Sequence, residues 1–364
     1  MMKSSLSPFQ ILLCLPLALL PLTVSAQMRI QSAALDEEHL ERLGEKDDVD
    51  RAVDAGLQYL LTRQNPTHGY FEGQLPNTYT ALSCMAIMAV GHMPDRSEYG
   101  EALRRGILFL VDAAEKNDGY FGAEGQARMY GHAIATLALL EAYGMMPTEA
   151  ENRRVRDAIQ KAIQVILDAQ VLDQRQRNHY GGWRYQPRPN DADLSVTVWQ
   201  VLALRAADNC GLEVPQERID LAMDYVRRTF RDDRGGFAYM TGHNNTGLAM
   251  RASGIVCILA MGEDPEAEDR ERILRAADFT RDFDPGSISR HFFYTAYYAA
   301  TSANMIDDEH RDRVLPAMEA FLIGKQNEDG SFPNHRGHDG GVYATAFSVI
   351  TLAVRYQYLP IYQE

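Results

Sequence analysis

The chain has 364 residues, of which 46% are hydrophobic, and its formal net charge is −14. This acidic balance makes nucleic acid and anionic membrane surfaces unfavourable partners, because both repel a negatively charged protein. Cys84, Cys210 and Cys257 each lie in a segment rich in small apolar residues, which indicates buried thiols and not a disulfide framework.

The N-terminal residues 1–26 have the pattern of a secretory signal peptide. Lys3 precedes a leucine-rich core, and the small residues Val24, Ser25 and Ala26 occupy the cleavage positions. The apolar run is too short and too interrupted by proline to predict a membrane span. Residues 27–50 are acidic and weakly patterned, which predicts an N-terminal arm. We therefore expect a secreted or periplasmic protein whose folded domain spans residues 51–364.

From Arg51 onward one unit recurs six times, with a period of about 52 residues. Each unit contains an amphipathic helical segment, a turn with glycine and an aromatic residue, and a second helical segment rich in Ala, Ser and Thr. The first segment carries charges on one face, as an outer helix should, whereas the second is expected to be buried nearly all round. Six such pairs can close into a ring. The sequence thus predicts an all-α, single-domain α/α toroid with an inner and an outer ring.

The last repeat contains the stretch FLIGKQNEDGSF, in which Leu322 is followed by Gln326 and then by Asp329–Phe332. This spacing resembles the repeat motif of squalene and oxidosqualene cyclases and of protein prenyltransferase β subunits. The resemblance covers nearly all of residues 51–360 and implies the α/α toroid fold. It also implies that the motif is a structural clamp between outer helix and turn. The glutamine recurs as Gln64 in the first copy.

The clamp motif is incomplete in two of the other copies. Ala114 stands at the glutamine position of the second repeat, and Phe230 stands there in the fourth. The motif is therefore good evidence for the fold and poor evidence for one activity, since a fold of this kind supports several chemistries.

In a closed ring the inner helices run parallel, so their N-termini gather at one mouth. Unpaired backbone N–H groups and helix dipoles meet there, and convergent polar groups of this kind are where ligands bind. The residues that we expect to contact a ligand at the mouth are Tyr130, Trp183, Arg184, Tyr185, His243, Tyr294 and Tyr343. For the aromatic residues among them, core packing is the alternative.

Asp191 and Asp193 are the leading candidates for chemistry. The segment Asp191-Ala192-Asp193-Leu194 resembles the D-x-D-D element of class II terpene cyclases, in which the middle Asp protonates the substrate. Leu194 stands where that family has its last Asp. Asp191 could share a proton with Asp193, and Arg184 or Arg251 is the expected cationic partner. Alternatively, Asp193 is an ionised cap on the helix that follows. We interpret it as a cap and keep the general acid as the alternative.

The other polar candidates are weaker. His132 begins an inner segment, where it could act as acid or base or simply be hydrogen-bonded. His335, His338 and Asp339 have spacing that could hold a metal, but the glycines around them indicate a polar loop. In the late stretch that resembles the prenyltransferase zinc site, Tyr294 stands where that family has its histidine ligand. We expect no metal and no cofactor.

Three functions follow from these features. The leading interpretation is an exported toroid that binds a small apolar or neutral ligand, or a protein partner, at its mouth and lacks the family's complete catalytic signature. The first alternative is a squalene-hopene-like terpenoid cyclase or isomerase with Asp193 as general acid, supported by Asp191 or His132. The second alternative is a polysaccharide lyase or hydrolase of the (α/α)6 type.

Overall fold

The computed structural model describes residues 46–123, 128–262, 265–335 and 340–359. The predicted signal peptide, nearly all of the predicted acidic arm, and His338 and Asp339 lie outside these residues. From Asp48 onward the chain forms one compact unit. This unit begins slightly before the predicted start at Arg51.

Twelve α-helices alternate between two positions along the described chain. The outer helices are α3 (Asp48–Thr62), α5 (Glu98–Lys116), α7 (Glu149–Ala169), α9 (Gln216–Thr229), α11 (Ala267–Ala276) and α13 (Asp308–Ile323). The inner helices are α4 (Pro76–Ala89), α6 (Arg128–Glu141), α8 (Leu194–Asn209), α10 (Leu248–Leu259), α12 (Phe292–Ile306) and α14 (Val342–Ala353). Short elements complete the unit: β1 (Phe230–Arg231), β2 (Gly236–Phe237), η1 (Ala277–Thr280), η2 (Pro285–Ser287) and η3 (Val354–Tyr356).

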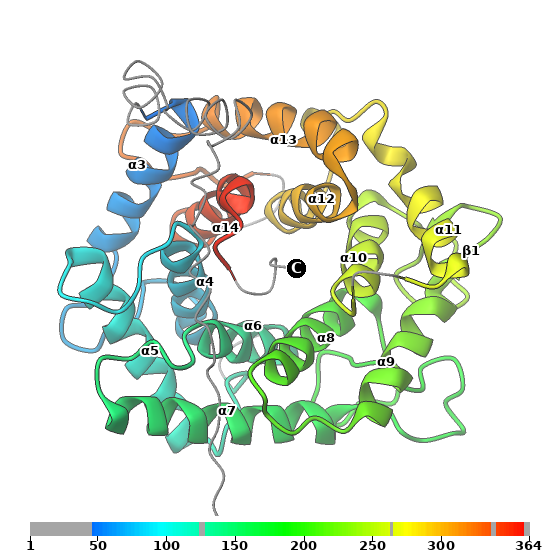
Figure 1. The fold of residues 1–364 in the computed structure, drawn as a ribbon, viewed down its shortest axis with the longest axis horizontal. Helices are drawn as coiled ribbons and strands as arrows, with labels where there is room; N and C mark the ends of the chain where they lie inside the picture. Colours follow the sequence, from blue (N-terminus) through cyan, green and yellow to red (C-terminus); the bar gives the residue numbers. More distant parts are fainter. Residues whose placement is uncertain (1–45, 124–127, 263–264, 336–339, 360–364) are drawn as a thin grey trace, which may run out of the picture. The chain divides into compact units, whose positions relative to one another are not determined.

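The inner helices form a closed ring within this unit (Figure 1). Each inner helix contacts the next one along the chain, and α14 contacts α4, which closes the circle. The outer helices surround this ring, one for each inner helix (Figure 1). The predicted all-α toroid of six helix pairs is therefore confirmed.

The sequence explains why the two rings differ. Along α5, residues such as Leu103, Ile107 and Leu110 are buried while the opposite face carries charge, so the helix is amphipathic. In α4, by contrast, every residue from Asn77 to Ala89 is buried. Small side chains such as Ala, Ser and Thr let such a helix lie close to its neighbours. None of the helices in the described ranges combines the length and the apolar character that crossing a bilayer requires.

The cysteines fit this interior. Cys84 and Cys257 are buried, Cys210 is partly buried, and all three are free thiols. Burial raises the pKa of the Cys84 and Cys257 thiols, so both remain protonated.

The predicted glutamine clamp is present, and it reaches further than the motif implied. Gln64 Nε2 donates to the carbonyl oxygen of Gly69 in its own turn, at 2.9 Å, and to that of Ala102 on α5, at 2.7 Å. It thus joins the turn to the next outer helix; we call this contact a joint. The same pair of donations is made by Gln170 to Gly181 and Arg218, and by Gln326 to Gly330 and Ala52.

A second hydrogen bond supports each of these joints from the inner ring. The N–H of the turn aromatic donates to a threonine hydroxyl of the following inner helix, at 2.9 to 3.1 Å. The pairs are Phe71 with Thr80, Trp183 with Thr197, and Phe332 with Thr345. Outer helix, turn and inner helix are therefore locked together in each repeat that has the glutamine.

In the second and fourth repeats, which lack the glutamine, an inner-helix side chain completes the joint. His132 on α6 accepts from the N–H of Phe121 through Nδ1, at 3.4 Å, and its Nε2 lies 3.0 Å from the carbonyl oxygen of Ala162 on α7. One histidine thus replaces both the threonine and the glutamine.

In the fourth repeat Arg251 on α10 has the corresponding place. Its Nη1 donates to the carbonyl oxygens of Gly235, at 3.1 Å, and Arg275 on α11, at 3.5 Å. The expectation that Arg251 pairs with Asp191 or Asp193 was therefore wrong, because backbone carbonyls bind its guanidinium instead. Phe230, at the glutamine position, packs on Phe237 with ring centroids 5.1 Å apart.

Candidate functional site

The N-terminal ends of neighbouring inner helices are tied to the turn of the following repeat. Asn77 Nδ2 donates to the carbonyl oxygen of Phe121 at 2.9 Å. The backbone N–H of Met129, at the start of α6, donates to the carbonyl oxygen of Tyr185 at 3.1 Å. The backbone N–H of Leu194, at the start of α8, donates to the carbonyl oxygen of Tyr239 at 2.8 Å. These bonds bring the beginnings of α6 and α8 together with the turns of the third and fourth repeats.

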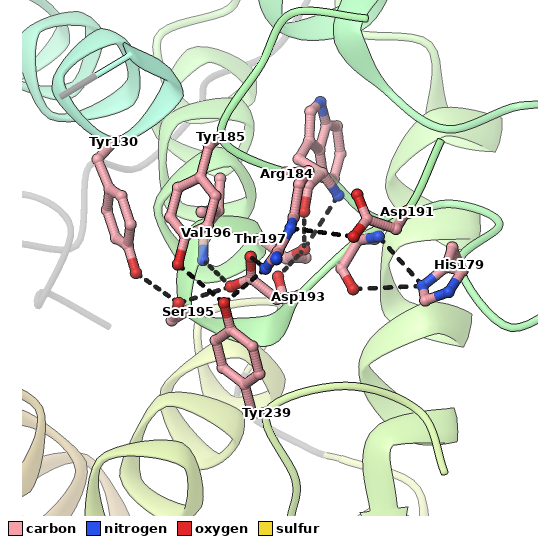
Figure 2. Close-up of polar contacts among 12 residues, drawn as sticks. Tyr130, His179, Arg184, Tyr185, Asp191, Asp193, Ser195, Val196, Thr197 and Tyr239 are labelled. Carbon is pink, nitrogen blue, oxygen red and sulfur yellow. Dashed lines mark hydrogen bonds and ion pairs between the residues drawn. The ribbon is translucent and has the colours of Figure 1, made fainter. Parts of the chain in front are cut away.

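Arg184 is the centre of the polar cluster at this place (Figure 2). Its Nη1 donates to Asp193 Oδ2 at 2.6 Å and to the Tyr239 hydroxyl at 2.5 Å, and its Nε lies 3.2 Å from Asp191 Oδ2. The guanidinium also lies over the Tyr185 ring, 4.5 Å from its centroid. Arg184 is thus held by two carboxylates and two phenol rings, which fixes its position.

Asp193 is the predicted cap of α8. Its Oδ1 accepts from the Val196 N–H at 3.0 Å and from the Ser195 hydroxyl at 2.5 Å, while Oδ2 accepts from Arg184. The carboxyl group is fully buried, and burial raises the pKa of Asp193, whereas the bonds from Ser195, Arg184 and Val196 act in the opposite direction. Both oxygens accept from donors, so the contacts fit the ionised form, which accepts only.

Three partly buried tyrosines surround this ion pair (Figure 2). The Tyr130 hydroxyl donates to Ser195 Oγ, and the hydroxyls of Tyr185 and Tyr239 lie 2.8 Å apart. The rings of Tyr130 and Tyr185 have centroids 5.7 Å apart. Burial raises the pKa of Tyr130 and of Tyr239, so these two groups are neutral phenols at physiological pH. We call Arg184, Asp191, Asp193, Ser195 and the three tyrosines the Arg184 cluster.

Tyr294 lies next to this cluster but deeper. It is buried, and its hydroxyl lies 3.1 Å from Ser253 Oγ and donates to the carbonyl oxygen of Ser195 at 3.4 Å. Burial raises the pKa of Tyr294 well above its ordinary value, so it too is neutral.

The remaining predicted site residues lie elsewhere. Trp183 and His132 are fully buried, and the indole Nε1 of Trp183 donates to the carbonyl oxygen of Ile166 at 2.7 Å. His243 is exposed, with its ring 6.4 Å from that of Tyr239. Tyr343 on α14 packs against Tyr79 on α4 at 5.8 Å. The structure thus unites five of the predicted residues: Tyr130, Arg184, Tyr185, Asp191 and Asp193.

The sequence reasoning missed Tyr239 as a member of the cluster. The internal repeat carries the signal that finds it, because Phe237-Ala238-Tyr239 corresponds to Trp183-Arg184-Tyr185. In both repeats the tyrosine follows the turn aromatic by two positions. The Ser195 hydroxyl, which donates to Asp193 Oδ1, was also missed.

The described residues contain no group of three His, Cys, Asp or Glu side chains placed to hold a metal ion. His335 packs against Phe292, with ring centroids 4.7 Å apart. Its predicted neighbours His338 and Asp339 lie outside the described residues. The polar loop that the sequence indicates there therefore stays a prediction.

The fold and the joints define a class of protein, the helical toroids built from repeated helix pairs. Within that class, the chain belongs to the prenyltransferase alpha-alpha toroid domain family, whose model matches residues 30–178 and 184–353. No curated protein matches the chain by sequence.

Solved structures of similar fold include several enzymes of polysaccharide breakdown. The GH76A α-1,6-mannanase from Salegentibacter sp. HEL1_6 has a TM-score of 0.61 at 11% identity, covering 85% of this chain and 99% of that chain. An unsaturated glucuronyl hydrolase specific for heparin has a TM-score of 0.57 at 10% identity, with 85% and 97% covered. A polysaccharide lyase has a TM-score of 0.54 at 12% identity, with 85% and 98% covered. At such low identity these similarities show the fold alone.

Proposed function

We propose that the Arg184 cluster is the binding site for a carbohydrate chain and that the protein is an exported glycan-binding toroid. The observation that carries this proposal is the set of three partly exposed tyrosines, Tyr130, Tyr185 and Tyr239, held by one hydrogen-bond network. A tyrosine presents an apolar ring and a polar hydroxyl together, which suits a sugar ring with its apolar face and its rim of hydroxyls.

The similar folds support this ligand class. The mannanase, the glucuronyl hydrolase and the polysaccharide lyase are named for their action on sugar chains, and one mannanase structure contains α-1,6-mannotriose. The predicted signal peptide supports export to a compartment where polysaccharides are encountered.

We assign binding, and not bond cleavage, to Asp193. Glycoside hydrolysis uses two carboxyl groups that flank the scissile bond, one of them able to donate a proton. Asp193 is buried, caps α8 and pairs with Arg184, so its contacts favour the carboxylate. The same contacts argue against a cyclase in which Asp193 protonates an alkene.

The test is a binding screen with two site variants and one matched control. We expect the wild-type protein to bind at least one of yeast mannan, xylan, β-glucan, polygalacturonate or heparin. Tyr185→Ala and Tyr239→Ala should each weaken that binding by about 5- to 30-fold, because each removes a ring worth about 1–2 kcal/mol of contact.

The control is Tyr358→Ala. Tyr358 is 55% exposed and follows the C-terminal end of α14, whereas the cluster lies at the N-terminal ends of inner helices. This variant should bind as the wild type does. If no glycan binds, or if all three variants bind equally well, the proposal is overturned.

A further inference from the structure

We propose that Asp191 sets the charge selectivity of the Arg184 cluster, so that the site accepts neutral sugar chains and rejects chains that contain uronic acids. This inference rests on the proposed carbohydrate site and names its substrate class. The glycan enzymes of similar fold do not decide the point, since they include both a mannanase and a hydrolase specific for heparin.

The charges of the cluster favour a neutral ligand. Arg184 supplies one positive charge, and Asp191 and Asp193 supply two negative charges, at 3.2 Å and 2.6 Å from its nitrogens. Tyr130 and Tyr239 are neutral, since burial raises the pKa of both phenols. The contacting groups therefore sum to one negative charge, which repels a ligand carboxylate in a partly buried site.

Arg184 also already bonds to the protein through N–H groups that a ligand carboxylate would need. A ligand carboxylate binds best to a guanidinium through two parallel N–H···O bonds. In this structure Nη1 is bound to Asp193 and Tyr239, and Nε faces Asp191. A uronate would have to displace a protein group from Nη1 or Nε before it could form two parallel bonds with Arg184.

The two aspartates contribute to this charge in different ways. Asp193 is fully buried, and it also accepts from Ser195 and Val196, so its removal would disturb the start of α8. The Asp191 side chain is 42% exposed and pairs with the Nε of Arg184 (Figure 2). Asp191 is therefore the residue that a ligand meets and the one whose charge can be removed without loss of the cap.

The experiment compares wild type, Asp191→Asn and the matched control Asp112→Asn. Asp112 is an exposed aspartate that pairs with Arg154 between α5 and α7 on the outer ring, so its variant changes the net charge equally. The probes are α-1,6-mannotetraose, xylotetraose and cellotetraose as neutral chains, and tetragalacturonate and a heparin tetrasaccharide as acidic chains. Dissociation constants are measured by titration calorimetry at low and at physiological ionic strength, after thermal melting has shown that each variant is folded.

We expect the wild type and Asp112→Asn to bind a neutral chain and to bind the acidic chains at least tenfold more weakly. Asp191→Asn should bind the acidic chains on the order of tenfold more tightly than the wild type, with an affinity that falls as salt rises. The ratio of its affinities for acidic and neutral chains is therefore the readout, and it should rise by on the order of tenfold, because only the acidic chains carry the charge that Asp191 repels.

The outcomes separate the two proposals. If the wild type binds acidic chains as tightly as neutral ones, or if Asp191→Asn gains no affinity for them, the charge inference is overturned while the carbohydrate site stands. If none of the variants binds any of the chains in this set or in the wider screen, the carbohydrate site itself is overturned and the inference falls with it.

Discussion

The joints of the ring are of two kinds, and the difference between them shows how a repeat protein tolerates the loss of its own motif. Where the glutamine is present, the donor comes from just after the end of the outer helix, as from Gln170 to Gly181 and Arg218. In the second and fourth repeats, where it is absent, the inner helix supplies the donor through His132 or Arg251. In both kinds of joint a carbonyl of the next outer helix gains a donor, because buried backbone groups need partners whichever helix provides them.

The arginine joint also differs from the glutamine joints in how closely the chain packs. At a glutamine joint, a Cβ on Gly69 would lie 2.5 Å from the carbonyl oxygen of Arg105, and its φ of 79° suits glycine. At the arginine joint, a Cβ on Gly235 would lie 3.7 Å from the nearest atom, the carbonyl oxygen of Arg275. The wider separation is bridged by the longer Arg251 side chain, whereas a glutamine joint leaves no such gap.

Among the variants that test the two kinds of joint, His132→Ala should cause the largest loss of stability. His132 is fully buried and replaces two side chains of the other joints, so its loss leaves the N–H of Phe121 and the carbonyl of Ala162 without these partners and opens a cavity. We expect the free energy of unfolding to fall by about 3 kcal/mol, measured by urea denaturation.

A rescue variant tests the reason for that loss. His132→Thr combined with Ala114→Gln rebuilds the joint of the other repeats, with threonine on the inner helix and glutamine on the outer helix. It should recover more than half of the stability lost in His132→Ala. A loss below about 1 kcal/mol in His132→Ala would show that this histidine is not a joint.

The second effect is a pH dependence found only at the histidine joint. Burial lowers the pKa of His132 to about 4, well below that of an exposed histidine. At a pH between the pKa of His132 in the folded protein and its pKa in the unfolded chain, the unfolded chain binds the proton more readily. The stability that neutral His132 contributes is therefore fully present above the unfolded pKa and falls as the pH drops toward 4. We expect His132 to account for a loss of about 2–3 kcal/mol between pH 7 and pH 4.5.

Urea denaturation of the wild type and of the rescue variant at both pH values isolates this contribution. Carboxylates elsewhere in the chain titrate equally in both proteins, so only the difference between the two pH profiles reports on His132. Identical profiles would mean that His132 keeps its proton in the fold and that the neutral form is not required.

The third effect is the loss of stability when a glutamine joint is removed, which can be compared with the loss at the histidine joint. Gln170→Ala removes the donations to Gly181 and Arg218 and also the acceptor for Arg218 Nη1 at 2.9 Å. We expect a loss of about 2 kcal/mol in the free energy of unfolding, since two buried carbonyls lose a donor. Gln164→Ala, on the same helix but exposed and bonded only to Asp168, is the control and should cost less than about 0.5 kcal/mol.

Much of this architecture was predictable because it depends on periodicity. The six repeats, the buried character of the inner helices and the glutamine clamp all follow from local pattern. Ala114 and Phe230 showed where the clamp was missing, but the sequence did not reveal what replaces it. The turn N–H and its inner-helix acceptor are separated by 9, 11, 14 and 13 residues in the first, second, third and sixth repeats, so turn length hides the equivalence of His132 with threonine.

The candidate site was predictable only within one repeat. Arg184, Asp191 and Asp193 are close in sequence, and the cap at Asp193 follows from its place before an apolar helix. Tyr239 and Tyr130 come from the neighbouring repeats, and only the closed ring brings their hydroxyls to the same ion pair.

The smallest effect should come from Arg251→Met, which keeps most of the side-chain volume and removes the guanidinium. Arg251 is only partly buried, so water can reach some of the carbonyls that it leaves, and its bond to Arg275 is long at 3.5 Å. We expect a loss of about 1 kcal/mol, about half of that in Gln170→Ala. Because Arg251 touches neither Asp191 nor Asp193 in its hydrogen bonds, glycan affinity should stay at the wild-type value. A loss of affinity without a loss of stability would instead place Arg251 in the ligand site and leave the fourth joint to Phe230 alone.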